Sequence, residues 1–503
     1  MSEPFYVTTA ISYPNGPPHI GHAYEAIAAD AIARFQRSRG RDVRFQTGTD
    51  EHGLKMAQAA RGEGIEPREF ADKMSLLFQQ MCDTLNVSYD RFIRTSQPDH
   101  YRASQAIWKA MEERGDLYLD RYEGWYSVRD EAYYEPDELT SAEDGSKRSP
   151  QGTPVEWTVE ESWFFRLSKY QQPLLDHYAA NPDFIMPESR RNEVVRFVEG
   201  GLKDLSISRT SFDWGVPVPG SNNHVMYVWL DALTNYITGL GYPDDTELWR
   251  RYWPANVHLI GKDVVRFHAI YWPAFLMSAG IALPRQVYGH GFLLSRGEKM
   301  SKSVGNVVDP MVLADRFGVD ALRYFLLREV TFGQDGSYSA EAIVNRANAE
   351  LSNSFGNLAQ RALSMIHKNL GGILPAPGEA AEDRDLLDFV KEIASVDMVE
   401  HFGRLGFSYG IEAWMKAVFA CNAYIDAQAP WVLRKTDPER MAAVLGTLVV
   451  AVRELARSIA PIIPDSADKL LNLIDAGEGG APIPQPMPLF PRLELSEDED
   501  AAA

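Results

Sequence analysis

Two short motifs limit what this chain can fold into more than any other feature of the sequence. His19-Ile20-Gly21-His22 lies near the start, and Lys299-Met300-Ser301-Lys302-Ser303 lies past the middle. The first motif follows an apolar, strand-like run at residues 5–11 and a proline-rich turn at 14–18, and a helical pattern follows it. Backbone N–H groups at the start of a helix favour anions, and a neutral histidine can donate a hydrogen bond to a phosphate oxygen. Together the two motifs predict a binding site for the triphosphate of ATP.

The succession of elements divides the chain into segments. A strand, a turn, a helix and a second strand open the chain, which is typical of a parallel nucleotide-binding sheet. We therefore predict an α/β fold: a Rossmann-like parallel-sheet catalytic domain that carries an inserted connective module and is followed by an α-helical bundle. The expected segments are the first half of the catalytic domain at 1–118, the insertion at 119–224, the second half at 225–345, the bundle at 346–495 and a disordered acidic tail at 496–503.

Composition is ordinary for a globular protein. The chain has 503 residues, of which 45% are hydrophobic and 24% charged, enough for about two to four domains. No apolar stretch approaches the roughly 18 residues of a membrane span, and the N-terminus lacks the basic start of a secretory signal. We expect a cytoplasmic enzyme with no membrane partner. Cys82 and Cys421 are the only cysteines, so one chain can build neither a disulfide framework nor a four-thiolate metal site.

Four further motifs accompany the first two. They are Ile11-Ser12-Tyr13-Pro14-Asn15-Gly16, Gly48-Thr49-Asp50-Glu51-His52-Gly53, Tyr227-Val228-Trp229-Leu230-Asp231-Ala232 and Gly261-Lys262-Asp263-Val264-Val265-Arg266-Phe267-His268. With them the chain resembles the class I aminoacyl-tRNA synthetases and, among these, the methionyl-tRNA synthetases. The resemblance spans nearly the whole chain and is thinnest after about residue 370.

The resemblance implies a reaction and its participants. Methionine is activated by ATP, with Mg²⁺, to methionyl-adenylate and pyrophosphate, and the methionyl group then passes to the 3′-terminal adenosine of initiator and elongator tRNA(Met). Homocysteine lacks one methyl group, a difference worth only about 1–3 kcal/mol, so binding alone should misactivate it. Relatives correct this error in the synthetic site by forming a thiolactone, and the same is expected here.

The resemblance also implies roles for individual residues. The expected catalytic residues are His19, His22, Lys299 and Lys302. The expected contacts to ATP are His19, His22, Gly261, Asp263 and Lys302. The expected methionine pocket consists of Ile11, Tyr13, Asp50, Trp229, Tyr236, Phe267 and His268. The expected anticodon contacts are Asn357, Arg361 and Trp431. Thioether–aromatic contacts contribute only about 0.3–1.5 kcal/mol each, so several rings must converge to select methionine.

The inserted module departs from the best-known family pattern, in which cysteine pairs bind zinc. Ser127-x-x-Asp130 and Ser149-x-x-Gly152 stand at the corresponding spacing, and three of these four positions carry weak ligands or none. We predict a turn region without metal, packed by aromatic residues such as Trp125, Tyr126 and Tyr133. Some relatives also carry a C-terminal dimerisation domain, which has no counterpart after the bundle here, so a monomer is expected.

The formal net charge of -20 opposes binding of tRNA, because Lys and Arg normally supply much of such affinity. Basic residues between Arg190 and Arg209 could offset this charge locally, or could form a solvated face balanced by neighbouring acidic residues, and the sequence leaves both open.

Three alternative functions fit the sequence less well. A class I synthetase for leucine, isoleucine or valine would need a larger editing insertion than 119–224 accommodates, and one for cysteine would need a metal–thiolate pocket. A small-molecule adenylyltransferase would share the first motif but would not need the bundle that carries Arg361 and Trp431. A non-catalytic tRNA-binding relative is disfavoured because both catalytic motifs are intact.

Overall fold

The computed structural model describes residues 2–130, 132–142, 144–295, 298–299 and 307–495. The chain divides into two compact units, and neither is continuous in sequence. The first unit holds the chain up to His290 except Asp30–Ser38 and Thr84–Asn86. The second unit holds those two segments and the chain from Gly291 onward.

A six-stranded parallel sheet forms the centre of the first unit. Its order is β3 (Arg91–Arg94), β2 (Asp42–Thr49), β1 (Pro4–Thr9), β13 (Val257–Gly261), β14 (Val287–His290) and β9 (Ile185–Met186). The strands are apolar because both faces of a parallel sheet are covered: Phe5, Tyr6 and Val7 of β1 are all buried. The strand order reverses between β1 and β13, and ligands of such sheets bind beyond the carboxyl ends of the strands at this point.

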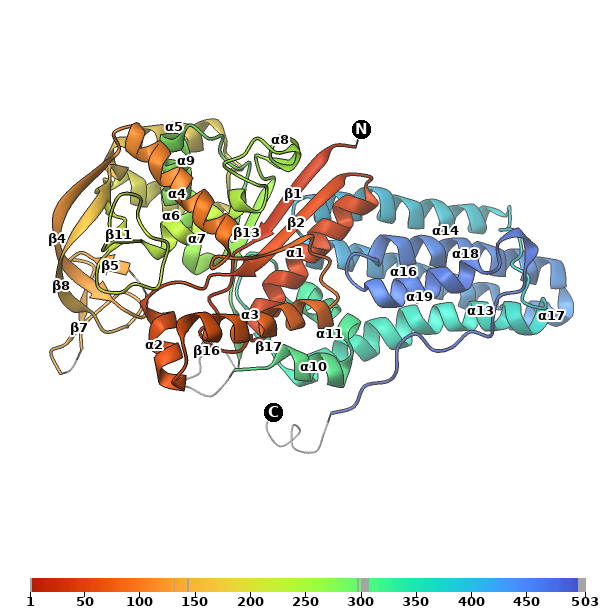
Figure 1. Ribbon diagram of the computed structural model, residues 1–503. Coiled ribbons are helices and arrows are strands. Elements are labelled where there is room, and N and C mark those ends of the chain that lie inside the picture. Colours follow the sequence, from red (N-terminus) through yellow and green to blue (C-terminus); the bar gives the residue numbers. More distant parts are fainter. Residues whose placement is uncertain (1, 131, 143, 296–297, 300–306, 496–503) are drawn as a thin grey trace. The chain divides into compact units, whose positions relative to one another are not determined.

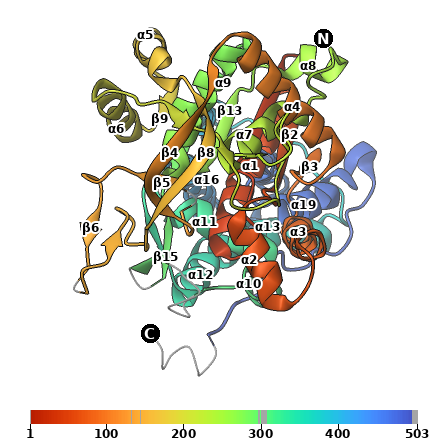
Figure 2. The same ribbon diagram turned by 60° about the vertical axis from the view of Figure 1, so that its left-hand side comes forward.

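Helices of the first unit cover the sheet. They are α1 (Ile20–Ser38), α2 (Leu54–Glu63), α3 (Pro67–Thr84), α4 (Pro98–Glu113), η1 (Leu167–Tyr170), α5 (Gln171–Ala180), α6 (Glu188–Glu199), α7 (Val228–Thr238), α8 (Glu247–Tyr252), η2 (Lys262–Val264), η3 (Phe267–Tyr271) and α9 (Trp272–Ala279). α1 belongs to the first unit only as far as Ala29, and α3 as far as Asp83. α4 packs against α7 and α9 (Figure 2). Every residue of α7 except Trp229 is buried, so this helix contacts protein on nearly all sides.

The segment after α4 builds a separate antiparallel sheet in the order β10 (Leu205–Ser206), β8 (Glu156–Phe165), β4 (Leu117–Ser127) and β5 (Ala132–Tyr134). Figure 1 shows its two long strands, β4 and β8, side by side. Shorter pairs join β6 (Thr140–Ser141) to β7 (Lys147–Arg148) and β11 (Ser208–Arg209) to β12 (Val225–Met226). Trp125 and Trp157 are cross-strand partners with ring centroids 5.5 Å apart.

Hydroxyl groups and one carboxylate hold the turn that contains Ser127-x-x-Asp130 and Ser149-x-x-Gly152. The Asp130 network consists of Asp130, Ser127, Tyr134, Ser149 and Thr153. Asp130 Oδ2 accepts hydrogen bonds from Ser149 Oγ at 2.8 Å, from Tyr134 OH at 2.9 Å and from Thr153 Oγ1. Ser127 Oγ lies 2.8 Å from Thr153 Oγ1. Within the described residues, no three His, Cys, Asp or Glu side chains are grouped to hold a metal ion.

Replacing Asp130 with alanine should destabilise this inserted sheet by about 2–3 kcal/mol, because buried hydroxyl groups lose their common acceptor. Amide hydrogen exchange should then accelerate in β4, β5 and β8 and stay unchanged in β1 and β2. Asp120→Ala, an exposed position on β4, is the matched control and should leave exchange unaltered. Elemental analysis of the wild-type protein should find no zinc. Tightly held zinc, or unchanged exchange in Asp130→Ala, would contradict this account.

The second unit is mainly helical. Its helices are α10 (Pro310–Phe317), α11 (Val319–Glu329), α12 (Ala340–Arg346), η4 (Ala347–Gly356), α13 (Asn357–Asn369), α14 (Ala381–Glu392), η5 (Ile393–Asp397), α15 (Met398–Gly403), α16 (Phe407–Gln428), α17 (Pro430–Thr436), α18 (Pro438–Ile459), α19 (Pro464–Asp475) and η6 (Glu478–Gly480). Its strands are β15 (Leu293–Ser295), β16 (Glu298–Lys299) and β17 (Gly336–Tyr338). α18 packs against α13, α14 and α16 (Figure 1). No helix among the described residues is long and apolar enough to span a membrane.

The core of the helical unit follows from amphipathic spacing. Met441, Leu445, Leu448 and Leu455 form a buried stripe along α18. Trp414 of α16 is fully buried, and its indole N–H donates a hydrogen bond to the Leu455 carbonyl at 3.0 Å. The parallel sheet and the following helices confirm the predicted α/β fold class.

A buried ion pair lies inside the second unit. Arg323 of α11 and Asp30 of α1 are both fully buried, and their charged atoms are 2.6 Å apart. The guanidinium also donates to the carbonyls of Leu85, Pro461 and Ile462 at 3.0–3.1 Å. The pair therefore joins the second half of α1 to α11 and to the turn between α18 and α19.

Candidate functional site

The candidate site lies where β1, β2 and β13 end at the reversal of strand order. Beyond β1 the chain stays beside β2, because Ser12 N–H donates to the Gly48 carbonyl at 2.9 Å and Asp50 N–H donates to the Ser12 carbonyl at 2.8 Å. On the other side, Ala10 N–H donates to the Leu259 carbonyl of β13 at 2.9 Å. These bonds place Ile11, Tyr13 and Asp50 at one edge of the sheet.

His19 and His22 stand at the start of α1, with ring centroids 3.8 Å apart. His22 Nδ1 accepts from the backbone N–H of His19, and His19 Nδ1 accepts from that of Gly21, each at 3.1 Å. A nitrogen that accepts carries no proton, so each imidazole is neutral in this arrangement and holds its hydrogen on Nε2. A Cβ at position 21 would lie 2.9 Å from the His19 ring, so a larger residue here would displace that ring.

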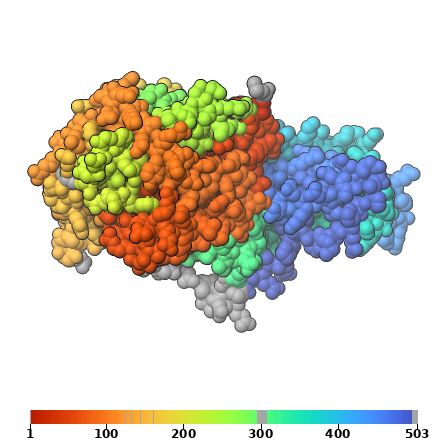
Figure 3. Space-filling view, in the orientation of Figure 1, coloured from red at the N-terminus to blue at the C-terminus, as the bar shows by residue number. Residues whose placement is uncertain are grey.

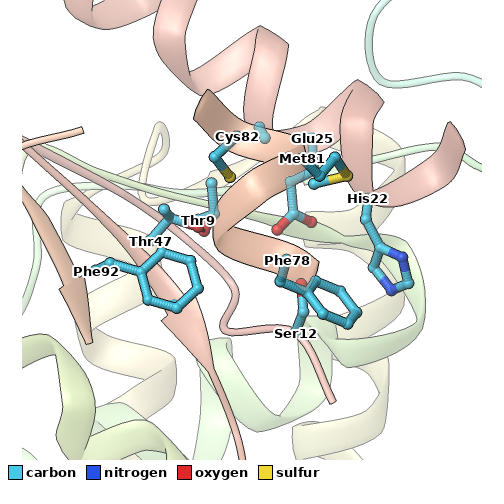
Figure 4. Close-up of a pocket in the computed structure, with 11 residues that line it drawn as sticks. Thr9, Ser12, His22, Glu25, Thr47, Phe78, Met81, Cys82 and Phe92 are labelled. Atoms are coloured by element: carbon cyan, nitrogen blue, oxygen red, sulfur yellow. Dashed lines mark hydrogen bonds between the residues drawn. The ribbon is translucent and has the colours of Figure 1, made fainter. Parts of the chain in front are cut away.

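A small cavity lies beside His22 (Figure 4). Figure 4 shows His22 and Glu25 of α1 at the wall opposite Thr47 and Phe92. Glu25 Oε2 lies 2.8 Å from His290 Nε2. Burial raises the pKa of Glu25, and the hydrogen bond to His290 opposes this shift. Neither residue was among those expected from the sequence, although Glu25 follows His22 by one helical turn and that spacing places both on one face of α1.

Gly261 and Asp263 lie at and just beyond the end of β13. A Cβ at Gly261 would lie 2.8 Å from Asp263 Oδ1, so glycine lets the carboxylate fold back over the strand end. Asp263 also raises the pKa of Glu25 through its charge. The two carboxylates therefore belong to the same edge of the sheet as His22, which is where an ATP ribose and its phosphates are expected.

Four residues of the expected methionine pocket contact one another in pairs. The rings of Trp229 and Phe267 stack with centroids 3.7 Å apart and planes at 5°. Tyr236 OH lies 2.6 Å from His268 Nε2, and His268 Nδ1 lies 2.9 Å from the Val264 carbonyl. A carbonyl only accepts, so Nδ1 carries the hydrogen and Nε2 accepts from Tyr236. Burial lowers the pKa of His268 to about 4, which keeps this imidazole neutral at physiological pH.

Tyr13 and Asp50, also expected in the pocket, lie at the edge of the sheet beyond β1 and β2. Tyr13 OH donates to the His52 carbonyl at 3.0 Å, and Asp50 is buried. The backbone just after Asp50 is held by Trp214, whose indole N–H donates to the Glu51 carbonyl at 2.6 Å. In the space-filling view, the yellow-green surface of the segment between β11 and β12 borders the orange surface of the earlier chain (Figure 3).

A buried carboxylate of α7 lies between two histidines. The Asp231 network consists of Asp231, His52, His100 and Tyr101. The Asp231 carboxylate is fully buried and lies 2.7 Å from His52 Nδ1 and 2.7 Å from His100 Nε2. His52 Nε2 lies 2.9 Å from Tyr101 OH. Burial alone raises the pKa of a carboxyl group, but His52 and His100 hold the pKa of Asp231 at about 2, so it is ionised. No sequence motif predicted this network.

The lysine motif is described only in part. Lys299 lies in β16, where its backbone pairs with Leu294 of β15. Lys302 lies outside the described residues. The roles expected for both lysines therefore stay predictions.

The three expected anticodon residues lie in the second unit. Asn357 and Arg361 are one turn apart on α13, and Arg361 lies with its guanidinium carbon 5.2 Å from the centroid of the Trp431 ring. Arg361 also donates to Asp426 Oδ1 of α16 at 2.7 Å. The Trp431 side chain is 44% exposed, so a planar partner can stack on it. An exposed aromatic ring beside a guanidinium suits an unstacked base.

Comparisons with known proteins show which family the chain matches. The family described as "tRNA synthetases class I (M)" matches residues 5–363, and "Anticodon binding domain of methionyl tRNA ligase" matches 399–485. The chain is 57% identical to a methionine–tRNA ligase of Brucella suis over 99% of both chains, and 55% identical to one of Mycobacterium bovis over 98% of both. A Mycobacterium tuberculosis methionyl-tRNA synthetase solved in complex with methionyl-adenylate is similar with a TM-score of 0.94 and 55% identity, covering 97% of this chain and 100% of that one.

Proposed function

Because the chain belongs to the class I methionyl-tRNA synthetases, we propose that its described site activates methionine with ATP and that its helical unit selects tRNA(Met). The chain is a methionine–tRNA ligase. The observation that most supports the assignment of residues is the pair of neutral imidazoles at the start of α1, beside the reversal point of the sheet. The segment boundaries given above, including the insertion at 119–224 and the anticodon-binding bundle at 346–495, belong to the same proposal.

In the first step, a carboxylate oxygen of methionine attacks the α-phosphorus of ATP. The bond from this phosphorus to the bridging oxygen breaks, and pyrophosphate leaves with its Mg²⁺. No covalent nucleophile is needed, so positioning and charge stabilisation provide the catalysis. We assign hydrogen-bond donation to Nε2 of His19 and His22, and neutralisation of the phosphates to Lys299 and Lys302. Gly261 and Asp263 contact the nucleoside. Mg²⁺ enters with ATP as part of the substrate.

The methionine side chain binds between the Trp229–Phe267 stack and the wall formed by Ile11 and Tyr13. Thioether sulfur is polarizable and binds aromatic rings, whereas a charged imidazole would disfavour it. The low pKa of His268 therefore suits this pocket, and Tyr236 keeps the ring in place. Asp50 binds the ammonium group of the substrate.

In the second step, a hydroxyl of the 3′-terminal adenosine of tRNA attacks the carbonyl carbon of the adenylate, and AMP leaves. We propose that Asn357, Arg361 and Trp431 contact the anticodon of both initiator and elongator tRNA. We also propose a cytoplasmic monomer. A stable dimer mass in light scattering would contradict the monomer.

Replacing Trp431 with alanine should lower kcat/KM for tRNA charging by about tenfold or more, because a base loses its stacking surface. Methionine-dependent ATP–pyrophosphate exchange should be unchanged, since that reaction needs no anticodon. Tyr409→Ala removes another exposed ring of the helical unit and is the matched control. An equal loss in both reactions would indicate a folding defect instead.

We further propose that homocysteine is edited in the synthetic site. The homocysteine thiol attacks the carbonyl carbon of its own adenylate, a C–S bond forms, and AMP leaves, which yields the thiolactone. Supplying ATP and homocysteine should release thiolactone, and its absence would reject this part of the proposal.

One assay tests the substrate assignment. Pyrophosphate exchange should be measured with each of the twenty amino acids, followed by charging of initiator and elongator tRNA(Met). Methionine should support the fastest exchange, and both tRNAs should be charged. Faster exchange with another amino acid would overturn the proposed function.

A further inference from the structure

The Asp231 network connects three elements of the first unit that are far apart in sequence. Asp231 lies in α7, His100 and Tyr101 lie in α4, and His52 follows the end of β2. An ionised carboxylate can only accept hydrogen bonds, so His52 Nδ1 and His100 Nε2 must both donate. On the other side of the ring, His52 Nε2 lies 2.9 Å from the hydroxyl of Tyr101. The orientation of every ring in this chain of contacts is thus fixed.

Each end of the network continues directly into a wall of the expected methionine pocket. Asp231 follows Trp229 by two residues in α7. His52 follows Asp50 by two residues, and the His52 carbonyl accepts from Tyr13 OH at 3.0 Å. The contact between Asp231 and His52 therefore links α7, which carries Trp229, to the segment that carries Asp50 and bonds Tyr13.

We propose that Asp231 is a positioning residue that sets the width of the methionine pocket through His52. The inference rests on the proposed function, because it assumes that these walls bind methionine. Asp231 does not contact the substrate itself. Charge-assisted hydrogen bonds are shorter and stronger than neutral ones, and a binding site keeps its geometry only when the residues behind it are fixed.

The selectivity of the pocket depends on this geometry. Sulfur–aromatic contacts are individually weak and act only at close range, so a pocket that widens slightly loses several of them together. Norleucine has a methylene in place of sulfur and is held by shape alone. A widened pocket should therefore lose more affinity for methionine than for norleucine.

The test is Asp231→Asn, assayed by pyrophosphate exchange. The amide keeps the volume of the side chain but removes the charge and one acceptor. The KM for methionine should rise by about tenfold, the KM for ATP should change by less than about twofold, and the methionine preference over norleucine should fall. Tyr101→Phe retains the ring packed on His52 and removes only the hydroxyl, so it should raise the KM for methionine by a smaller factor, about twofold to threefold.

Asp116→Asn is the matched control. Asp116 is another fully buried carboxylate of the first unit, bonded to Lys169, Tyr170 and Ser278. Its replacement should lower thermal stability without changing either the KM for methionine or the norleucine ratio. A general loss of packing around Asp231 would likewise lower stability and the active fraction, but would leave the KM for methionine and the ratio unmoved.

A folded Asp231→Asn protein with wild-type KM for methionine and wild-type preference would overturn the inference. If that variant does not fold, an unchanged KM in Tyr101→Phe does so instead. Neither outcome affects the proposed function, which is tested by methionine-dependent exchange of the wild-type enzyme.

Discussion

Replacement of His22 by alanine is expected to slow methionine-dependent ATP–pyrophosphate exchange by about 100-fold, the usual cost of losing one donor to charge that develops in a transition state. His22 Nδ1 is occupied by the backbone N–H of His19, so the ring presents its hydrogen at Nε2. The loss should appear in kcat, with the KM for methionine little changed, because the proposed contact of this ring is to phosphate and not to the amino acid.

His22→Gln distinguishes a donor from a merely structural ring. The glutamine amide can place an N–H near the position of Nε2, so this variant should recover about tenfold of the lost rate. His177→Ala in α5 removes a histidine with no expected contact to ATP and should leave exchange unchanged. Near-normal exchange in His22→Ala, or an equal loss in His22→Gln, would reject the assigned role.

Removing Asp30 should destabilise the second unit by about 3–5 kcal/mol, the largest change in stability that we expect from one substitution. Asp30→Ala leaves the Arg323 guanidinium fully buried without its carboxylate. The carbonyls of Pro461 and Ile462 still accept from it, but they carry no compensating charge. Hydrogen exchange of α11 and α19 should accelerate accordingly, and the parallel sheet should be affected less.

Two further variants separate the effect of the buried Arg323 charge from that of lost packing. The exposed pair Glu329–Arg346 has side chains 36% and 30% exposed, so Glu329→Ala should cost at most about 1 kcal/mol. The double variant Asp30→Leu/Arg323→Met removes both charges and should be more stable than Asp30→Ala alone. A double variant as unstable as the single one would show that packing, and not the ion pair, stabilises this region.

Local patterns were predictable from the sequence, whereas contacts between distant segments were not. The strand, turn and helix around His19 and His22 follow from residues that are close in the chain, and the structure has them in that order. His52 and Asp231 are 179 residues apart, and His100 and Asp231 are 131 apart. Nothing in their spacing predicts that they meet, because the packing of α4 and α7 brings them together.

In the inserted sheet, contacts between residues that are close in sequence were also only partly predictable. The residue types at Ser127, Asp130, Ser149 and Gly152 argued against zinc, and aromatic packing was expected to replace it. Tyr126 and Tyr133 do pack, with centroids 4.8 Å apart. The hydrogen-bond network, however, depends on Thr153 and Tyr134, which stand outside the zinc spacing and carry no pattern of their own.

The interleaving of the two units has a practical consequence for protein engineering. A fragment that begins at Gly291 would contain every helix from α10 onward but would lack Asp30 and the loop at Thr84–Asn86. Its Arg323 would lose its counter-ion and the Leu85 carbonyl at once. A fragment that carries these helices into another enzyme therefore needs a carboxylate in the place of Asp30, or an uncharged residue in the place of Arg323.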